Sequence, residues 1–123
     1  MAQTIVKFDR RFQMWEYSVG HSQLLLRSVK DQKNPTRVDV YFKGVAALNM
    51  PTLFHGLQVS EVGEDQWRSL KVDFGALDLI EQKFFKVTGD GWQGWVVAYV
   101  VFSHEDDGEY YTESKFCNLR FGR

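Results

Sequence analysis

The sequence holds three histidines, and two of them lie beside glycine in stretches that suggest turns. His21 follows Gly20 and has serines nearby, and His55 precedes Gly56. Imidazole titrates near neutral pH, so either residue could act as a general base toward a hydroxyl group or a water molecule. The chain has no G-x-S-x-G sequence to expose a serine nucleophile. We therefore predict no catalytic residue and no enzyme, and a hydrolase that uses an exposed histidine remains an alternative.

The third histidine opens the densest polar run of the chain, HEDDGE at residues 104–109. Its four carboxylates and one imidazole could gather a divalent cation. The run lacks the Asp-x-Asp-x-Asp-Gly order of an EF-hand loop, and Asp107-Gly108 is itself a hairpin turn signal. The single cysteine, Cys117, excludes both an internal disulfide and a zinc site made from several cysteines. We predict a solvated hairpin tip here, and neither a metal nor a cofactor.

Residues 89–94, GDGWQG, fit the G-x-G-x-x-G pattern of dinucleotide-binding loops. That pattern binds a pyrophosphate only where a helix follows, because the N-terminus of the helix holds the anion. Residues 95–102, WVVAYVVF, are instead β-branched and aromatic, a composition that favours an extended chain. The glycines therefore predict a turn between two strands and no nucleotide site.

Basic residues gather in the N-terminal third, close to Phe8, Phe12 and Trp15, a mixture that nucleic-acid-binding surfaces also show. The whole chain has a net charge of −1 and no RNP1 motif, so we predict no nucleic-acid binding. Residues 1–60 hold eight Lys/Arg and four Asp/Glu, whereas residues 61–123 hold seven and twelve. These charges either mix within one sheet or form a dipolar surface that favours association.

Period-two alternation recurs along the chain, and a helical period does not. Residues 36–43 place Val38, Val40 and Phe42 on one face and charged side chains on the other, which predicts a half-buried strand. The other predicted strands cover residues 11–19, 23–29, 57–62, 67–74, 84–88, 95–103 and 109–120. Turns are predicted at residues 20–21, 30–35, 55–56, 63–65, 89–94 and 106–108, and short helical turns at residues 45–49 and 77–82.

These elements predict one mainly β domain over residues 1–123, because a chain of this length buries one ordinary core. We expect an antiparallel β-sandwich or open barrel of about eight strands, with at most one or two short helical turns. Residues 95–102 are apolar on both faces, so they lie at the centre of a layered fold or meet a partner. Sheets often stack such a face in a homodimer, which we also predict.

No apolar run approaches the roughly 20 residues that cross a bilayer, and the first residues do not resemble a secretory signal. We therefore expect a cytoplasmic protein with no membrane partner. The 19 aromatic residues are many for one small core, and Tyr and Trp suit interfaces because each joins a large apolar face to a polar group. Ordinary cross-strand packing is the alternative. The interface or ligand candidates are Trp15, Tyr17, Trp92, Trp95, Tyr99, Tyr110 and Tyr111.

The strings HSQLLLRS at 21–28, RVDVYFKGV at 37–45, MPT at 50–52 and HGL at 55–57 cover about the first half of the chain. In this order they resemble small bacterial proteins that are carried as mobile gene cassettes or that lie beside polymorphic toxins as immunity proteins. The resemblance implies a bacterial accessory protein and assigns no functional residue.

We predict a non-catalytic binding protein of immunity or adaptor type, which docks a protein partner through a preformed aromatic and charged surface. The alternative is a small-ligand binding module with a cavity lined by Trp15, Tyr17, Trp95 and Tyr99.

Overall fold

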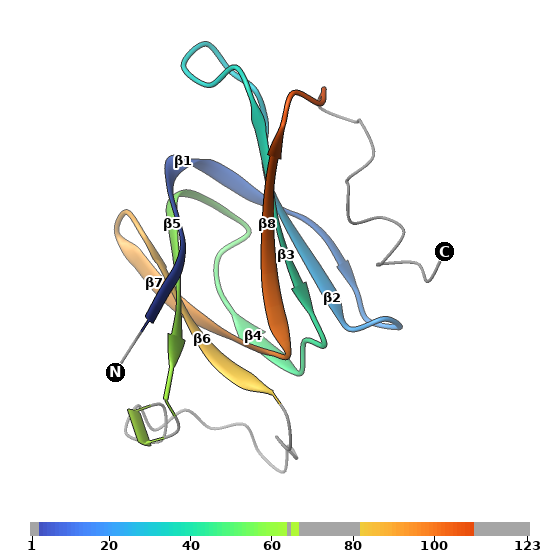
Figure 1. Cartoon of the computed structure of the whole chain (residues 1–123), viewed down its shortest axis with the longest axis vertical. Helices are drawn as coiled ribbons and strands as arrows, with labels where there is room; N and C mark the ends of the chain where they lie inside the picture. The colour runs from blue at the N-terminus through green and yellow to red at the C-terminus, as the bar shows by residue number, and fades with distance from the viewer. Residues whose placement is uncertain (1–2, 64, 67–81, 110–123) are drawn as a thin grey trace.

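The chain folds into one open, antiparallel β-sheet, seen in a computed structural model that describes residues 3–63, 65–66 and 82–109 (Figure 1). The strands are β1 (Gln3–Ser18), β2 (Gln23–Ser28), β3 (Arg37–Lys43), β4 (Ala47–Asn49), β5 (Leu53–Val62), β6 (Lys83–Gly89), β7 (Trp92–Ala98) and β8 (Val100–Asp106). Their order in the sheet is β4-β7-β6-β5-β1-β2-β3-β8. The prediction of a mainly β fold with about eight antiparallel strands is confirmed.

Alternation and turn signals placed most of the strands. The strands predicted at residues 23–29, 36–43 and 84–88 are β2, β3 and β6, and those at 11–19 and 57–62 are parts of the longer β1 and β5. The strands predicted at 67–74 and 109–120 and the helical turn at 77–82 lie almost entirely outside the described residues.

One apolar cluster fills the concave side of the sheet. It takes inward-facing side chains from β1, β2, β3, β5, β6, β7 and β8, and Figure 1 shows the sheet curling around this space. Val40 and Phe42 of β3 and Leu24 and Leu26 of β2 are fully buried within it. Burying a side chain of this size contributes roughly 1.5–3 kcal/mol relative to leaving it in water, so this cluster is the main source of stability.

The two ends of the sheet meet at a corner. There β3 continues into β4 through residues 44–46, and β7 continues into β8 through Tyr99. The Tyr99 N–H donates to the Lys43 carbonyl at 2.9 Å, and the Ala46 N–H donates to the Val97 carbonyl at 2.8 Å. Because β3 pairs with β8 and β4 pairs with β7, the two bent strands remain neighbours on both sides of the corner.

This corner corrects the prediction of one strand over residues 95–103 at the centre of the fold. The apolar run is two strands, with β7 paired on both sides and β8 at the end of the strand order. An apolar run that turns a corner contributes side chains to the core from two strands. In composition it therefore resembles one strand that is covered on both faces.

The helical turn predicted at residues 45–49 is also wrong, because residues 47–49 form β4 and Asn49 pairs with Trp95 of β7. A β-carbon on Gly94 would lie 2.0 Å from the Asn49 carbonyl oxygen, so the glycine allows the two backbones to approach this closely. The turn predicted at His55-Gly56 is wrong as well, since both residues lie inside β5.

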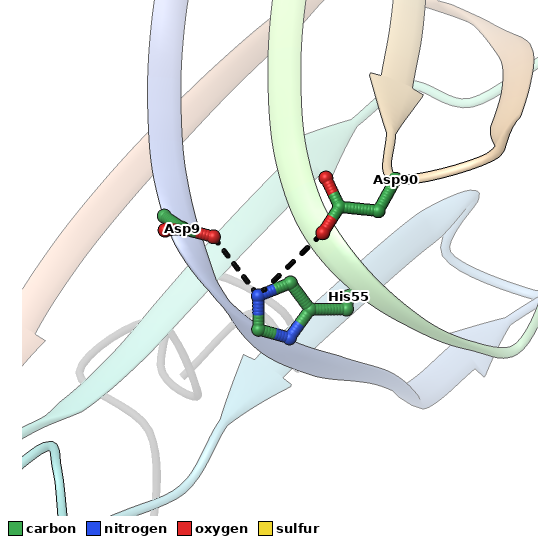
Figure 2. Close-up of side chains that lie close together, drawn as sticks. All are labelled: Asp9, His55 and Asp90. Carbon is green, nitrogen blue, oxygen red and sulfur yellow. Dashed lines mark hydrogen bonds and ion pairs between the residues drawn. The ribbon is translucent and has the colours of Figure 1, made fainter.

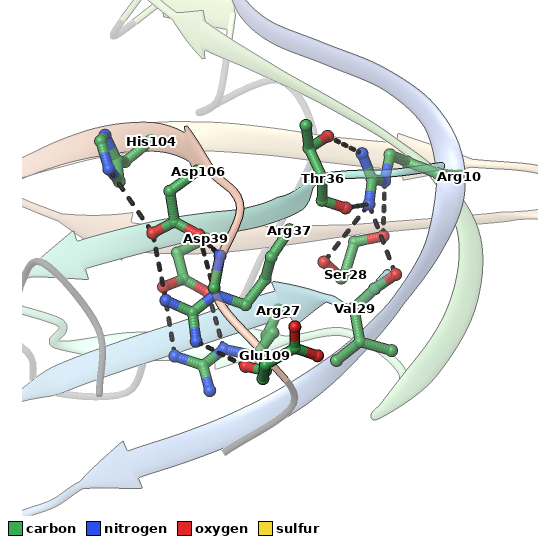
Figure 3. A network of polar contacts seen from close by, with 11 residues as sticks. Arg10, Arg27, Ser28, Val29, Thr36, Arg37, Asp39, His104, Asp106 and Glu109 are labelled. Carbon is green, nitrogen blue, oxygen red and sulfur yellow. Dashed lines mark hydrogen bonds and ion pairs between the residues drawn. The ribbon is translucent and has the colours of Figure 1, made fainter. Parts of the chain in front are cut away.

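The outer face of β3 is buried, which corrects the prediction of a half-buried strand. Asp39 receives a two-pronged hydrogen bond from Arg27 of β2, with N···O distances of 2.8 and 3.2 Å. Arg37 makes the same kind of contact with Asp106 of β8, at 3.2 and 3.1 Å (Figure 3). Charges can be buried where each meets an opposite charge in hydrogen-bonding geometry, and the alternation of residue types does not reveal such pairing across strands.

Candidate functional site

A β-bulge in β1 positions the first side chain of the candidate site. Phe8 pairs with Leu57 of β5 and Arg11 pairs with His55, so Asp9 and Arg10 together lie opposite Gly56. A bulge of this kind changes the direction in which the side chains point. Here Asp9 is exposed on the outside of the sheet, beside His55, while the next side chain is buried.

Arg10 is that buried side chain, and it ties the bulge to the β2–β3 hairpin. Its guanidinium donates to Ser28 Oγ at 2.7 Å and to the Thr36 carbonyl at 2.6 Å (Figure 3). Burial lowers the pKa of the Arg10 guanidinium, and the nearby carboxylates of Glu105 and Asp31 partly offset this by raising it. These bonds hold the backbone of the bulge in place and so fix the position from which Asp9 points outward.

Asp90, in the turn between β6 and β7, provides the third side chain of the site. The Asp90 N–H donates to the His55 carbonyl at 2.9 Å, which ties the turn to β5. Gly56 has φ +79°, and a β-carbon there would lie 3.3 Å from an oxygen of the Asp90 carboxylate. β6 ends at Gly89 and β7 begins at Trp92, so the predicted turn between two strands is confirmed at residues 90–91, and a strand, not a helix, follows it.

Asp9, His55 and Asp90 therefore meet on the surface as a histidine between two aspartates (Figure 2). The Nε2 atom of His55 lies 2.9 Å from Asp9 Oδ1 and 3.8 Å from Asp90 Oδ2. One ligand atom from each of the three residues lies within 4.8 Å of the other two. The side chains of Asp9, His55 and Asp90 are 92, 51 and 72% exposed, so water and ions reach them freely.

Two surface hollows flank this cluster. One, of about 670 Å³, is lined by Lys7, Gln58, Thr88 and both aspartates among others. The second, of about 560 Å³, is lined by His55, Asp9 and the loop at residues 31–34. In that loop a backbone N–H of Lys33 lowers the pKa of the Asp31 carboxyl, helped by Asn34. The cluster thus lies on the ridge between two solvent-filled depressions.

The arrangement offers the donor atoms of a cation site. Among the described residues, the hydrogen bonds and ion pairs of the His55 side chain run to carboxylates. Carboxylate oxygens and an imidazole nitrogen are donor atoms that divalent cations accept. The sequence singled out His55 but missed Asp9 and Asp90, because neither the bulge nor the turn contact leaves a local signal.

Of the predicted aromatic candidates, Trp15 and Trp92 lie in packed surroundings. Trp15 covers the Arg27 guanidinium, whose central carbon lies 4.6 Å from the ring centre. Trp92 packs against Phe54 with ring centres 4.7 Å apart. Both rings therefore contribute to stability through ordinary packing.

The other described candidates are Trp95, Tyr17 and Tyr99. Trp95 of β7 stacks on Phe84 of β6, with ring centres 6.0 Å apart. Tyr17, near the end of β1, and Tyr99, at the corner, are both exposed. Tyr110 and Tyr111 lie outside the described residues. None of the five described candidate rings lines the two hollows beside His55.

Neither a protein-family model nor a curated protein nor a solved structure matches this chain. The resemblance to gene-cassette and immunity proteins therefore stays a prediction. In the part of the chain that the structure describes, no helix is long and apolar enough to span a membrane.

Proposed function

We propose that the protein is a non-catalytic binding protein of immunity or adaptor type, and that a second copy of the chain is its first partner. The observation that carries the proposal is a group of exposed apolar side chains at one end of the sheet, which we call the apolar end: Tyr17, Val19, Tyr99 and Phe102. Val19 is 77% exposed, and Tyr99 and Phe102 are 44 and 40% exposed. Exposed aromatic side chains are enriched at protein interfaces.

The pairing register brings these positions to the same end of the sheet, although Tyr17 and Phe102 lie on opposite faces of it, because paired residues share a face and successive residues alternate. Tyr17 of β1 pairs with Leu24, which pairs with Phe42, which pairs with Val101 of β8. The β1–β2 turn that carries Val19 therefore lies at the end of the sheet where β8 begins. Three strand spacings of about 4.8 Å separate β1 from β8, so the apolar end is about 15 Å across, wide enough for the centre of a small interface.

Within the described residues, one backbone edge of β8 pairs with no other strand, and this edge lies beside the apolar end. Among these residues β8 is the last strand and pairs with β3 alone. Its first half, residues 100–102, is apolar, whereas His104, Glu105 and Asp106 occupy the second half. Such an edge can accept a strand from a partner, and the uncharged half is where pairing is least opposed.

The alternative of a small-ligand module has weaker support. Trp15 lies on β1 and Trp95 on β7, and β5 and β6 separate these strands in the sheet. A cavity lined by both rings is therefore not favoured by the strand order.

Analytical ultracentrifugation tests the proposal. We expect the wild type to be a dimer. The double variant Tyr99→Ser/Phe102→Ser should have a dimer dissociation constant at least tenfold higher, because less apolar surface is buried at the interface. The double variant Ile5→Ser/Leu53→Ser, which removes exposed apolar side chains elsewhere, is the matched control and should dimerise as the wild type does.

A wild-type chain that sediments as a monomer up to about 1 mM would contradict the proposal, because its binding free energy would then be weaker than about 4 kcal/mol. A dimer that tolerates the substitutions at the apolar end while the control dissociates would place the interface elsewhere.

A further inference from the structure

We propose that Asp9, His55 and Asp90 form a binding site for one divalent transition-metal ion, with zinc as the best fit. The proposal rests on the convergence of one imidazole nitrogen and two carboxylates from three separate elements: β1, β5 and the β6–β7 turn (Figure 2). It does not depend on the interface at the apolar end.

The distances fit a small cation. Zinc bonds of about 2.0–2.1 Å in tetrahedral geometry place neighbouring ligand atoms about 3.3 Å apart. The observed separations from His55 Nε2, 2.9 Å to Asp9 and 3.8 Å to Asp90, lie on either side of this value. All three side chains are exposed, so small rotations about their side-chain bonds suffice to bring the donor atoms around one ion.

The ligand types select the metal. Calcium and magnesium prefer sites made of oxygen atoms alone, whereas imidazole favours zinc and its neighbours in the first transition row. Two carboxylates balance the charge of a dication. Without the cation, two of their oxygens lie within 4.8 Å of each other and repel as like charges. Three protein ligands also leave a position open for water.

Backbone contacts fix the positions of the three ligand residues before a metal binds. The Asp90 N–H bond to the His55 carbonyl and the bulge opposite Gly56 fix where each side chain starts, so binding orders little of the main chain. Lys7 and Lys33, which line the flanking hollows, weaken the attraction for a cation. With three exposed ligands in place of four buried ones, we expect a dissociation constant on the order of 1–10 µM.

Isothermal titration calorimetry of the full chain with zinc chloride, without a histidine tag, tests the site. We expect one zinc ion per chain for the wild type. His55→Ala should weaken binding at least thirtyfold, and Asp9→Asn and Asp90→Asn each about tenfold. His21→Ala, which changes another exposed histidine, is the matched control and should bind zinc as the wild type does.

A titration with cobalt(II) gives a second measurement, since its visible absorption bands report the coordination geometry. Wild type that takes up no zinc at 100 µM, or unchanged binding by His55→Ala, would overturn the proposal. Loss of binding on His104→Ala in place of His55→Ala would move the site to β8 and would also contradict it. Calcium binding as tight as zinc binding would show that the imidazole is not a ligand.

Discussion

At the scale of single residues, stability depends on charges that are buried together. The Arg27 guanidinium meets the Asp39 carboxylate on one side and the Trp15 ring on the other, and both ions are almost fully shielded from water. An ion pair of this kind contributes little beyond what apolar residues would contribute, but the loss of one partner leaves the other charged and buried. The pair therefore helps to fix the register of β2 against β3, because any other register would separate the two charges.

Arg27→Ala should lower the free energy of unfolding by about 3–5 kcal/mol, because the buried Asp39 carboxyl would lose its partner. Arg11→Ala, which changes an exposed arginine on β1, should change it by less than about 0.5 kcal/mol. Urea denaturation followed by tryptophan fluorescence measures both. Equal losses for the two variants would show that the buried pair has no special role.

Asp106 makes stability depend on pH. Burial raises the pKa of its carboxyl, but the hydrogen bonds from Arg37 and from the Gly108 N–H, with the charges of Arg37 and His104, bring the pKa below its usual range. A carboxyl whose pKa is lowered by folding stabilises the protein above its unfolded pKa of about 3.9 and loses that contribution as the pH falls through the folded value.

Asp106→Asn should therefore reduce the unfolding free energy at pH 7 and flatten its decline between about pH 5 and pH 2. Part of the decline should remain, because the pKa of Asp31 is also lowered, chiefly by the Lys33 N–H. Urea denaturation at a series of pH values provides the measurement. A variant with the same decline as the wild type would show that Asp106 does not contribute to it.

At the scale of elements, the corner between the two bent strands depends on one glycine. Gly44 has φ +72°, and a β-carbon there would lie 1.9 Å from the Tyr99 ring. Gly44→Ala should therefore destabilise the fold by at least about 2 kcal/mol, through backbone strain and displacement of the ring. Gly20→Ala is the control, since no atom lies within 4 Å of a β-carbon at that position. Thermal unfolding separates the two, and similar midpoints would refute this role of Gly44.

The elements themselves could be predicted from the sequence in large part. Alternation located β3, because side chains of successive residues point to opposite faces and the inward ones must be apolar, and the neighbouring turn signals located β2 and β6. The corner at Tyr99 escaped prediction because it depends on the contact with Gly44, which is distant in the chain. The burial of both faces of β3 escaped for a similar reason, since charged residues predict a solvated face unless their partners are known.

At the scale of the whole molecule, the strand order and the candidate metal site could not be predicted. Asp9 and His55 are 46 positions apart, and the bulge that aims Asp9 at the imidazole has no sequence signature. His55 was identified by its residue type alone. The proposed dimer is also a property of the whole fold, because it requires the β1–β2 turn and the start of β8 to reach the same end.

The pairing of β3 with β8 has a consequence for the order in which the protein can assemble during translation. Lys43 pairs with Val100, so β3 leaves the ribosome long before the strand that covers its second edge has been synthesised. Until then an apolar strand edge stays open to other nascent chains, and closing so long a loop slows folding. Chaperone binding to ribosome-bound chains should therefore decline once β8 has emerged.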